Sequence, residues 1–198
     1  MKKILFGRIS LESDDRGEFI EDVYCEYILR DGQNTRIGRD IIPKNEVMNV
    51  EHTWPQSHGA KREPARGDMH HLFPTDSRAN STRGNHPFAE VNGKDARDNC
   101  EIAQAGKAID PDTGKTTNIH SFEPPLKHRG NVARAMFYMA TKYKWHIPAI
   151  EEFYLRKWNR EDPVDARELK RNDMIEQAQG NRNPYIDFPE LATRIRDF

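Results

Sequence analysis

Residues 49–85 carry the side chains of this sequence that are best suited to chemistry. Glu51 and His52 are adjacent, and Asn80 follows later in the same stretch. An imidazole has an unperturbed pKa that suits a general base near neutral pH. A carboxylate and an amide offer the oxygen ligands that Mg²⁺ prefers, and Mg²⁺ keeps several waters, so one or two protein oxygens are enough. Together the three groups indicate metal-assisted hydrolysis.

Hydrolysis of a phosphodiester is the reaction that these groups fit. A base must take a proton from water, and a cation must offset the charge that grows on the phosphoryl and leaving oxygens. We predict that His52 is the base and that Glu51 and Asn80 hold Mg²⁺, with Mn²⁺ or Ca²⁺ as substitutes. Taken singly, a Glu-His pair is common by chance, and Asn80 is more often a helix-surface amide.

Zinc is an alternative metal for the same stretch. His52 and His58 combined with His70 or His71 offer three imidazoles. However, the chain has neither a His-Glu-x-x-His helix motif nor paired Cys-x-x-Cys motifs, which are typical of zinc sites. The sequence therefore favours a hard cation, and the zinc interpretation stays open as the less favoured one.

Two strands and a helix must position the candidate residues. The pattern predicts a strand over residues 47–53 and a short strand over residues 69–73 that Pro74 ends. A helix over residues 76–83 follows, capped by Thr75 and stopped at Gly84. Side chains alternate along a strand, so Glu51 and His52 point to opposite faces unless the strand ends or bulges there. The following Thr-Trp-Pro favours an ending.

The rest of the chain divides into a mixed N-terminal part and a helical C-terminal third. Residues 19–29 read as one strand, and residues 54–67 as a loop. Residues 91–122 are rich in Asn, Asp, Gly and Lys and are the least ordered part by sequence. The predicted C-terminal helices span 132–143, 148–158 and 163–180, the last capped by Asp162, with a short helix after Pro189.

The composition describes a single domain over residues 1–198 with long solvated loops. Hydrophobic residues make up 35% and charged residues 32% of the chain. The net charge of −1 counts against very tight nonspecific binding of nucleic acid, although Lys and Arg outnumber Asp and Glu over residues 126–172. No apolar run is long enough to span a membrane, and the run after Lys3 is too short for a signal peptide.

Two cysteines, Cys25 and Cys100, are too few for a disulfide scaffold or a cysteine-rich zinc site. They fit either one disulfide in an oxidising compartment or two buried free thiols. The residues alone leave both open.

Several longer motifs resemble the bacterial endonuclease I family. They are the Glu-His followed by Trp-Pro-Gln-Ser, the Gly-Asp-x-His-x-Leu-Phe-Pro at residues 67–74, and an Asn six residues past that proline. An Arg-Gly-x-x-Ala-Arg at residues 129–134 precedes a Phe-Tyr-Met helix, and Gln-Gly-Asn-Arg-Asn-Pro-Tyr-Ile-Asp closes the set at residues 179–187. Nearly the whole chain is covered in order.

The resemblance implies an α+β fold with a ββα-metal (His-Me finger) nuclease core, a small sheet and a helical C-terminal part. It implies an endonuclease that cleaves DNA and RNA with little sequence specificity and leaves 5′-phosphates. The family's general base falls on His52 and its metal ligands on Glu51 and Asn80. It also implies a periplasmic or secreted protein, which we expect to be a monomer without membrane contact.

Arginines that contact phosphate are harder to place from the resemblance. The loop that carries such an arginine in the family is shorter here, so Arg62 and Arg66 are candidates by proximity alone. Arg129 lies in a matched motif and fits either phosphate contact or structural pairing. Two rival functions remain: a noncatalytic binding module on the same scaffold, and a nuclease specific for repair or toxicity. The intact Glu51, His52 and Asn80 set disfavours the binding module.

Overall fold

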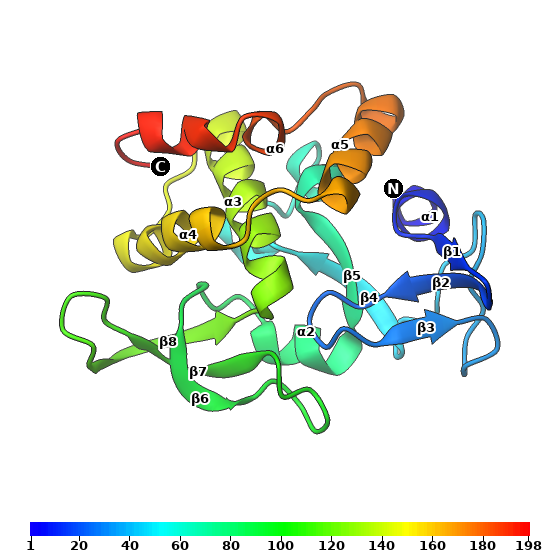
Figure 1. The fold of residues 1–198 in the computed structure, drawn as a ribbon, viewed down its shortest axis with the longest axis horizontal. Helices are drawn as coiled ribbons and strands as arrows, with labels where there is room; N and C mark the ends of the chain where they lie inside the picture. The colour runs from blue at the N-terminus through cyan, green and yellow to red at the C-terminus, as the bar shows by residue number, and fades with distance from the viewer.

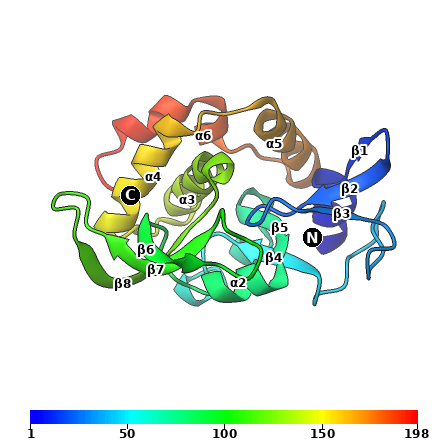
Figure 2. The ribbon, with the colours of Figure 1, turned by 60° about the horizontal axis from the view of Figure 1, so that its bottom comes forward.

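Eight strands form three separate antiparallel sheets in the computed structural model, which describes residues 1–198. The first sheet comprises β1 (Glu12–Asp14), β2 (Gly17–Glu21) and β3 (Ile28–Arg30). The second pairs β4 (Met48–His52) with β5 (Leu72–Asp76). The third comprises β6 (Val91–Asp95), β7 (Gln104–Ile109) and β8 (Thr116–Glu123). The two three-stranded sheets lie at opposite ends of the molecule, with β4 and β5 between them (Figure 1 and Figure 2).

Most of the helical residues follow the third sheet, and the fold is α+β as expected. The α-helices are α1 (Lys2–Ile4), α2 (Ser77–Arg83), α3 (Arg129–Tyr143), α4 (Ala149–Glu161), α5 (Ala166–Gln179) and α6 (Pro184–Asp187). A π-helical turn η1 (Leu5–Ile9) follows α1, and short 3₁₀ helices are η2 (Gln56–His58), η3 (Ala65–Gly67), η4 (Met69–His71), η5 (Leu126–His128) and η6 (Pro189–Arg194). Helices α3 to α6 gather on one side of the molecule (Figure 1). None of the helices has the length and apolar character needed to cross a bilayer.

Buried apolar side chains form two clusters, and the region of β4 and α2 contributes to both. The larger cluster is built on α3 and α4 and includes Ala79 from α2. The smaller one combines η1 with β2 and β3, and Met48 and Val50 from β4 join it. Because alternate residues of a strand share a face, β4 turns Met48 and Val50 toward the smaller cluster and leaves its other face to α2.

The prediction of one strand over residues 19–29 was wrong, because a turn interrupts it. The carboxylate of Asp22 accepts hydrogen bonds from the backbone N–H groups of Tyr24 and Cys25, at 3.1 and 2.9 Å. This side-chain capture of backbone donors competes with a strand ladder. Glu26 then takes a left-handed φ of 52°, and the chain reverses from β2 into β3.

Residues 91–122, which we expected to be poorly ordered, contain the third sheet. Several of their Asn, Asp, Gly and Lys residues lie on exposed positions of strands, where polar side chains are tolerated, and the others lie in the turns between the strands. Gly93 and Gly106 face each other across β6 and β7, and a Cβ on either one would collide with the backbone of the opposite strand. The chain turns between β7 and β8 at Gly114, which has a φ of 68°.

The three long C-terminal helices are present as predicted, but their bounds differ: α3 starts at Arg129, three residues early, and α4 ends at Glu161, three residues late. Helix α5 begins at Ala166, not at Pro163, and its N-cap is Asp165, which accepts from Glu168 N at 2.7 Å. Asp162, the predicted cap, accepts from the backbone N–H of Gly130 at 2.8 Å and so supports the start of α3. Gly180 ends α5 with φ of 85°, as predicted.

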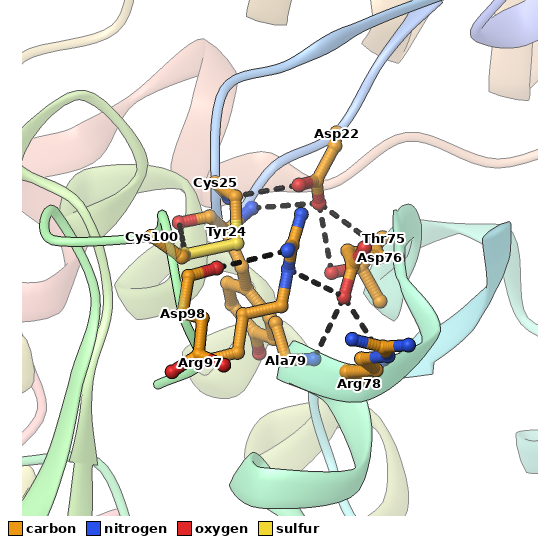
Figure 3. The surroundings of a disulfide bond; sticks show 10 residues. All are labelled: Asp22, Tyr24, Cys25, Thr75, Asp76, Arg78, Ala79, Arg97, Asp98 and Cys100. Carbon is orange, nitrogen blue, oxygen red and sulfur yellow. Dashed lines mark hydrogen bonds and ion pairs between the residues drawn. A yellow bond between two sulfur atoms is a disulfide. The ribbon is translucent and has the colours of Figure 1, made fainter. Parts of the chain in front are cut away.

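Cys25 and Cys100 form a disulfide, which decides between the two alternatives that the residues left open. The bond joins the β2–β3 turn to the loop between β6 and β7 (Figure 3). Their sequence separation is 75 residues, and cross-linking a loop of that size stabilises a fold by roughly 4 kcal/mol through the unfolded state.

Three buried histidines make stability fall in mild acid. Burial lowers the pKa of His70 to about 4 and those of His71 and His128 to about 3. Between about pH 6.5 and pH 4 the unfolded chain therefore binds protons that the folded chain does not, and stability falls as the pH falls. Burial raises the pKa of Glu151 to about 7, which works in the opposite direction. Each of the three histidines is expected to contribute a loss of about 1.4 kcal/mol per pH unit in that window.

Urea unfolding at a series of pH values between 7 and 5 measures this slope. His128→Asn should reduce it by about 1.4 kcal/mol per pH unit, because one titrating group is removed. His58→Asn is the matched control, since it makes the same substitution at an exposed histidine outside the buried set. An unfolding free energy that stays level over this range would contradict the prediction.

Candidate active site

β4, β5 and α2 form a continuous unit in which α2 starts where β5 ends. The predicted bounds need two corrections. Residues 69–71 form η4, and β5 runs on through Pro74, which fits there because β5 has a ladder partner on one side only. The cap of α2 is Asp76, not Thr75. Its carboxylate accepts from the N–H groups of Arg78 and Ala79, both at 2.9 Å.

Helix α2 docks on the face of β4 that carries Asn49 and Glu51. Asn80 Nδ2 donates to Asn49 Oδ1 at 2.6 Å and to the Val50 carbonyl at 3.2 Å. One turn later, Arg83 donates to the Thr53 carbonyl at 2.7 Å. Residues three apart on a helix share a face, so Asn80 and Arg83 both contact β4 from the same face of α2. Both of the Asn80 bonds are donated by its amide nitrogen. Its Oδ1 takes no part in them and is available as a ligand.

The charge of the buried Glu51 carboxylate is only partly compensated by its neighbours. Its side chain is 1% exposed, and Oε1 lies 3.4 Å from Arg83 Nε without forming a hydrogen bond of good geometry. Burial raises the pKa of Glu51, while the Arg83 charge and hydrogen bonding with Tyr24 act to lower it. A buried acceptor without a partner is costly, and a cation beside it would remove that cost. The donor set at Glu51 and Asn80 therefore fits a hard cation.

His52 lies on the opposite face of β4, at the last residue of the strand. The strand ends there, as the sequence predicted. The half-buried ring meets that of His71 edge-on at 5.5 Å, and Gln56 Nε2 lies 3.4 Å from both ring nitrogens. Burial lowers the pKa of His52, and hydrogen bonding to the backbone at Arg66 and Val50 opposes the shift. The ring is thus neutral at pH 7, the form that can accept a proton.

His70 and His71 are occupied with the backbone, which argues against zinc. The Nε2 atoms of His70 and His71 are bonded to the carbonyls of Asn181 and Ala65, at 3.0 and 2.8 Å. No group of three or more His, Cys, Asp or Glu side chains in the chain is arranged to hold a metal. The zinc interpretation that combined these histidines with His58 is therefore wrong.

Asp68 holds η4, whose His71 contacts His52, and the sequence analysis did not single it out. Its buried carboxylate accepts from Tyr138 and Lys142 of α3, both at 2.8 Å, and from Gln179 at 2.9 Å. Burial alone would raise the pKa of Asp68, but hydrogen bonds from Lys142 and Gln179 bring it to about 2. The carboxylate also caps η4, which carries His71, so this network positions the ring that touches His52.

The candidate arginines separate into exposed and internally paired ones. Arg62 and Arg66 have exposed side chains on the loop that follows His52. Arg129 is 12% exposed, makes ion pairs with Glu123 and Glu90, and lies with its guanidinium 5.3 Å from the ring of Trp158. These contacts favour the structural role for Arg129, whereas the two loop arginines are free to meet a phosphate.

Two further residues at the site, Arg83 and Tyr24, were not singled out from the sequence. Arg83 had a usable signal, because it lies three residues after Asn80 on the predicted helix and must share its face. Tyr24, whose hydrogen bonding acts to lower the pKa of Glu51, had none, since it lies on a turn that the sequence did not reveal.

Comparison with known proteins gives consistent matches over most of the chain. A family model described as Endonuclease I matches residues 7–190. The extracellular ribonuclease of Bacillus subtilis (strain 168) is 40% identical over 169 residues, which cover 74% of this chain and 53% of that protein. The periplasmic deoxyribonuclease of Aeromonas hydrophila is 35% identical over 172 residues, covering 82% of this chain and 69% of that protein. This chain thus spans about half the length of the Bacillus relative.

Proposed function

This chain belongs to the endonuclease I family, and we propose on that premise that it is a metal-dependent endonuclease of DNA and RNA with little sequence specificity. The two relatives support both substrates, since one is named a ribonuclease and the other a deoxyribonuclease. The observation that carries the proposal is the buried Glu51 carboxylate. Its Oε1 lacks a hydrogen-bond partner and lies on the strand that ends in the neutral His52.

We propose further that β4, β5 and α2 are a ββα-metal core within a single domain of residues 1–198. The order of the three elements and the docking of α2 on β4 support this assignment. In that core Glu51 and Asn80 would hold the cation through one carboxylate and one amide oxygen. Mg²⁺ accepts such a small set of protein ligands, and Mn²⁺ or Ca²⁺ are candidate substitutes.

His52 is the proposed catalytic base. Its neutral ring takes a proton from the water that attacks phosphorus, and the edge contact with His71 limits the tilt of the ring. When bound, a divalent cation supplies a positive charge that stabilises the phosphoryl oxygens and the leaving O3′. Cleavage of the bond between phosphorus and O3′ leaves a 5′-phosphate. Glu51 and Asn80 stay fixed on β4 and α2, so little rearrangement is needed during the reaction.

Substrate contact is proposed to run mainly through phosphates, which explains weak sequence preference. Arg62 and Arg66 are the proposed contributors from the loop, and binding should weaken as salt rises. We also propose a monomer that works in the periplasm or outside the cell. The names of the relatives support that location, and so does the disulfide, since disulfides persist in oxidising compartments.

Removal of divalent cations is expected to abolish nicking of supercoiled plasmid, because the base alone leaves the charge on the leaving oxygen uncompensated. The assay runs the protein with EDTA, then with Mg²⁺ restored in excess, and repeats the series with single-stranded RNA. Ends that accept ligation without phosphorylation would report the 5′-phosphate.

The same assay distinguishes the metal-dependent endonuclease from the two alternative functions, a noncatalytic binding module and a specific nuclease. Undiminished nicking in EDTA would contradict the metal-dependent mechanism. Retention of DNA without cleavage in Mg²⁺, Mn²⁺ and Ca²⁺ would favour the noncatalytic binding module. Cleavage confined to one sequence on a mapped plasmid would favour a specific nuclease.

A further inference from the structure

His86 and His120 form a pair of imidazoles outside the proposed active site. Their ring centroids lie 6.0 Å apart, and the ring planes are inclined by 39°. His86 lies in the segment that follows α2, and His120 lies on β8 of the third sheet. The rings are thus neighbours in space although 34 positions separate them in the chain.

The backbone of this region brings the two histidines into register. Phe88 pairs with Phe122 through an isolated parallel bridge, which two backbone hydrogen bonds of 2.9 and 3.2 Å close. Continued by two residues toward the N-terminus, the same register places His86 opposite His120. Opposite residues of neighbouring extended segments are in side-chain contact. The fold itself therefore pairs the two rings.

The segment that carries His86 is also anchored to the end of α2. The backbone N–H of His86 donates to the Arg83 carbonyl at 3.1 Å, and Arg83 NH1 donates to the Gly84 carbonyl, also at 3.1 Å. Arg83 is 1% exposed, so these bonds start from a fixed point. Both histidines are consequently carried by backbone that hydrogen bonds hold in place.

The ring nitrogens of the pair are free to bind a ligand. The rings of His70, His71 and His146 are bonded to backbone carbonyls, whereas no hydrogen bond involves the ring of His86 or His120. Burial and the neighbouring His120 lower the pKa of His86, so this ring is neutral at pH 7. A neutral imidazole nitrogen is the form that binds a metal.

The spacing of the rings suits a single metal ion between them. With Zn–N distances of about 2.0–2.1 Å, two imidazoles on one ion hold their ring centres roughly 5–6.5 Å apart. Imidazole nitrogen favours Zn²⁺, Cu²⁺ and Ni²⁺, while Mg²⁺ prefers oxygen ligands. Lys107 faces His120 from β7, but this side chain is exposed, so solvent screens its charge.

We propose that His86 and His120 bind one transition-metal cation of this class, with waters completing its coordination. Nitrogen ligands generally bind Cu²⁺ more tightly than Ni²⁺ or Zn²⁺, and the same order is expected here. The bound ion joins the end of α2 to β8, and a ligand that binds only the folded chain stabilises it. Glu51 and Asn80 take no part, so the inference does not depend on the proposed function.

His86→Asn and His120→Asn test the proposal, because each removes one imidazole from the surface. Calorimetric titration of Zn²⁺ into the unchanged protein, in excess Mg²⁺, should show a binding event that both variants weaken by about 10-fold or more. Zn²⁺ should raise the thermal unfolding midpoint of the unchanged protein more than that of either variant. The midpoints without metal check that both variants are folded.

The EPR spectrum of bound Cu²⁺ counts the ligands, since it should show coupling to two imidazole nitrogens in the unchanged protein and to one in each variant. His146→Asn is the matched control, because His146 is an exposed histidine between α3 and α4, and it should keep the binding event. Zn²⁺ affinity within about twofold of the unchanged protein in either variant of the pair would overturn the site. An equal loss in His146→Asn, or coupling to a single nitrogen in the unchanged protein, would overturn it too.

Discussion

His52→Ala is expected to lower kcat for plasmid cleavage by about 10³-fold while leaving the affinity for DNA nearly unchanged. Proton transfer by a positioned base contributes about 10²- to 10⁴-fold, and no other neutral imidazole is placed to replace it. The neighbouring His71 is tied to the Ala65 carbonyl and stays buried. Affinity should survive because phosphate contacts, not the base, hold the substrate.

Single-turnover cleavage measures the chemical step, and filter binding in EDTA measures affinity. The control is His58→Ala, which changes an exposed histidine of η2, just after β4, and should keep the full rate. Partial recovery of the His52→Ala rate by added imidazole would support the role of base. A rate within about tenfold of the unchanged protein would show that His52 is not the base.

Glu51→Gln is expected to abolish metal-dependent cleavage and weaken Mn²⁺ binding by more than about 100-fold. An amide keeps the shape of the side chain but loses the charge that attracts the cation. The change also leaves Arg83 buried without its counter-ion, which costs roughly 3–5 kcal/mol of stability. Activity must therefore be measured at a temperature where circular dichroism shows the variant to be folded.

Glu168→Gln supplies the matched control for that loss of stability. Glu168 is also a buried carboxylate paired with a buried arginine, at 2.6 Å from Arg134, but it lies on α5 outside the site. It should lower stability by a similar amount and leave the Mg²⁺ dependence unchanged. Full activity of folded Glu51→Gln with ordinary Mg²⁺ dependence would remove Glu51 from the proposed cation site.

The local pattern was sufficient to predict the strand, the helix and the order of the candidate residues. Alternation along β4 and the polar residues at the start of α2 are short-range signals, and each is read within one element. The bounds of β5 and the cap of α2 were misplaced by a few residues, because Pro74 was taken to end a strand that has a free edge.

The sheet of β6, β7 and β8 could not be predicted for a different reason. Its strands are polar on their exposed positions, so their composition resembles that of a loop. Pairing between strands supplies the stability that local propensity does not, and Gly93 opposite Gly106 is recognisable only once the two strands lie together. The division of residues 19–29 was likewise decided by where the Asp22 carboxylate finds its donors.

The sequence by itself determined the family, through motifs long enough to reveal it, and it nominated Glu51, His52 and Asn80 for the proposed chemistry. Tertiary structure alone decided what surrounds those groups. The Arg83 charge at Glu51, the buried hydroxyl of Tyr24 and the internal pairing of Arg129 join residues that are distant in the chain. No local pattern encodes such contacts, because burial and charge compensation depend on how separate elements pack.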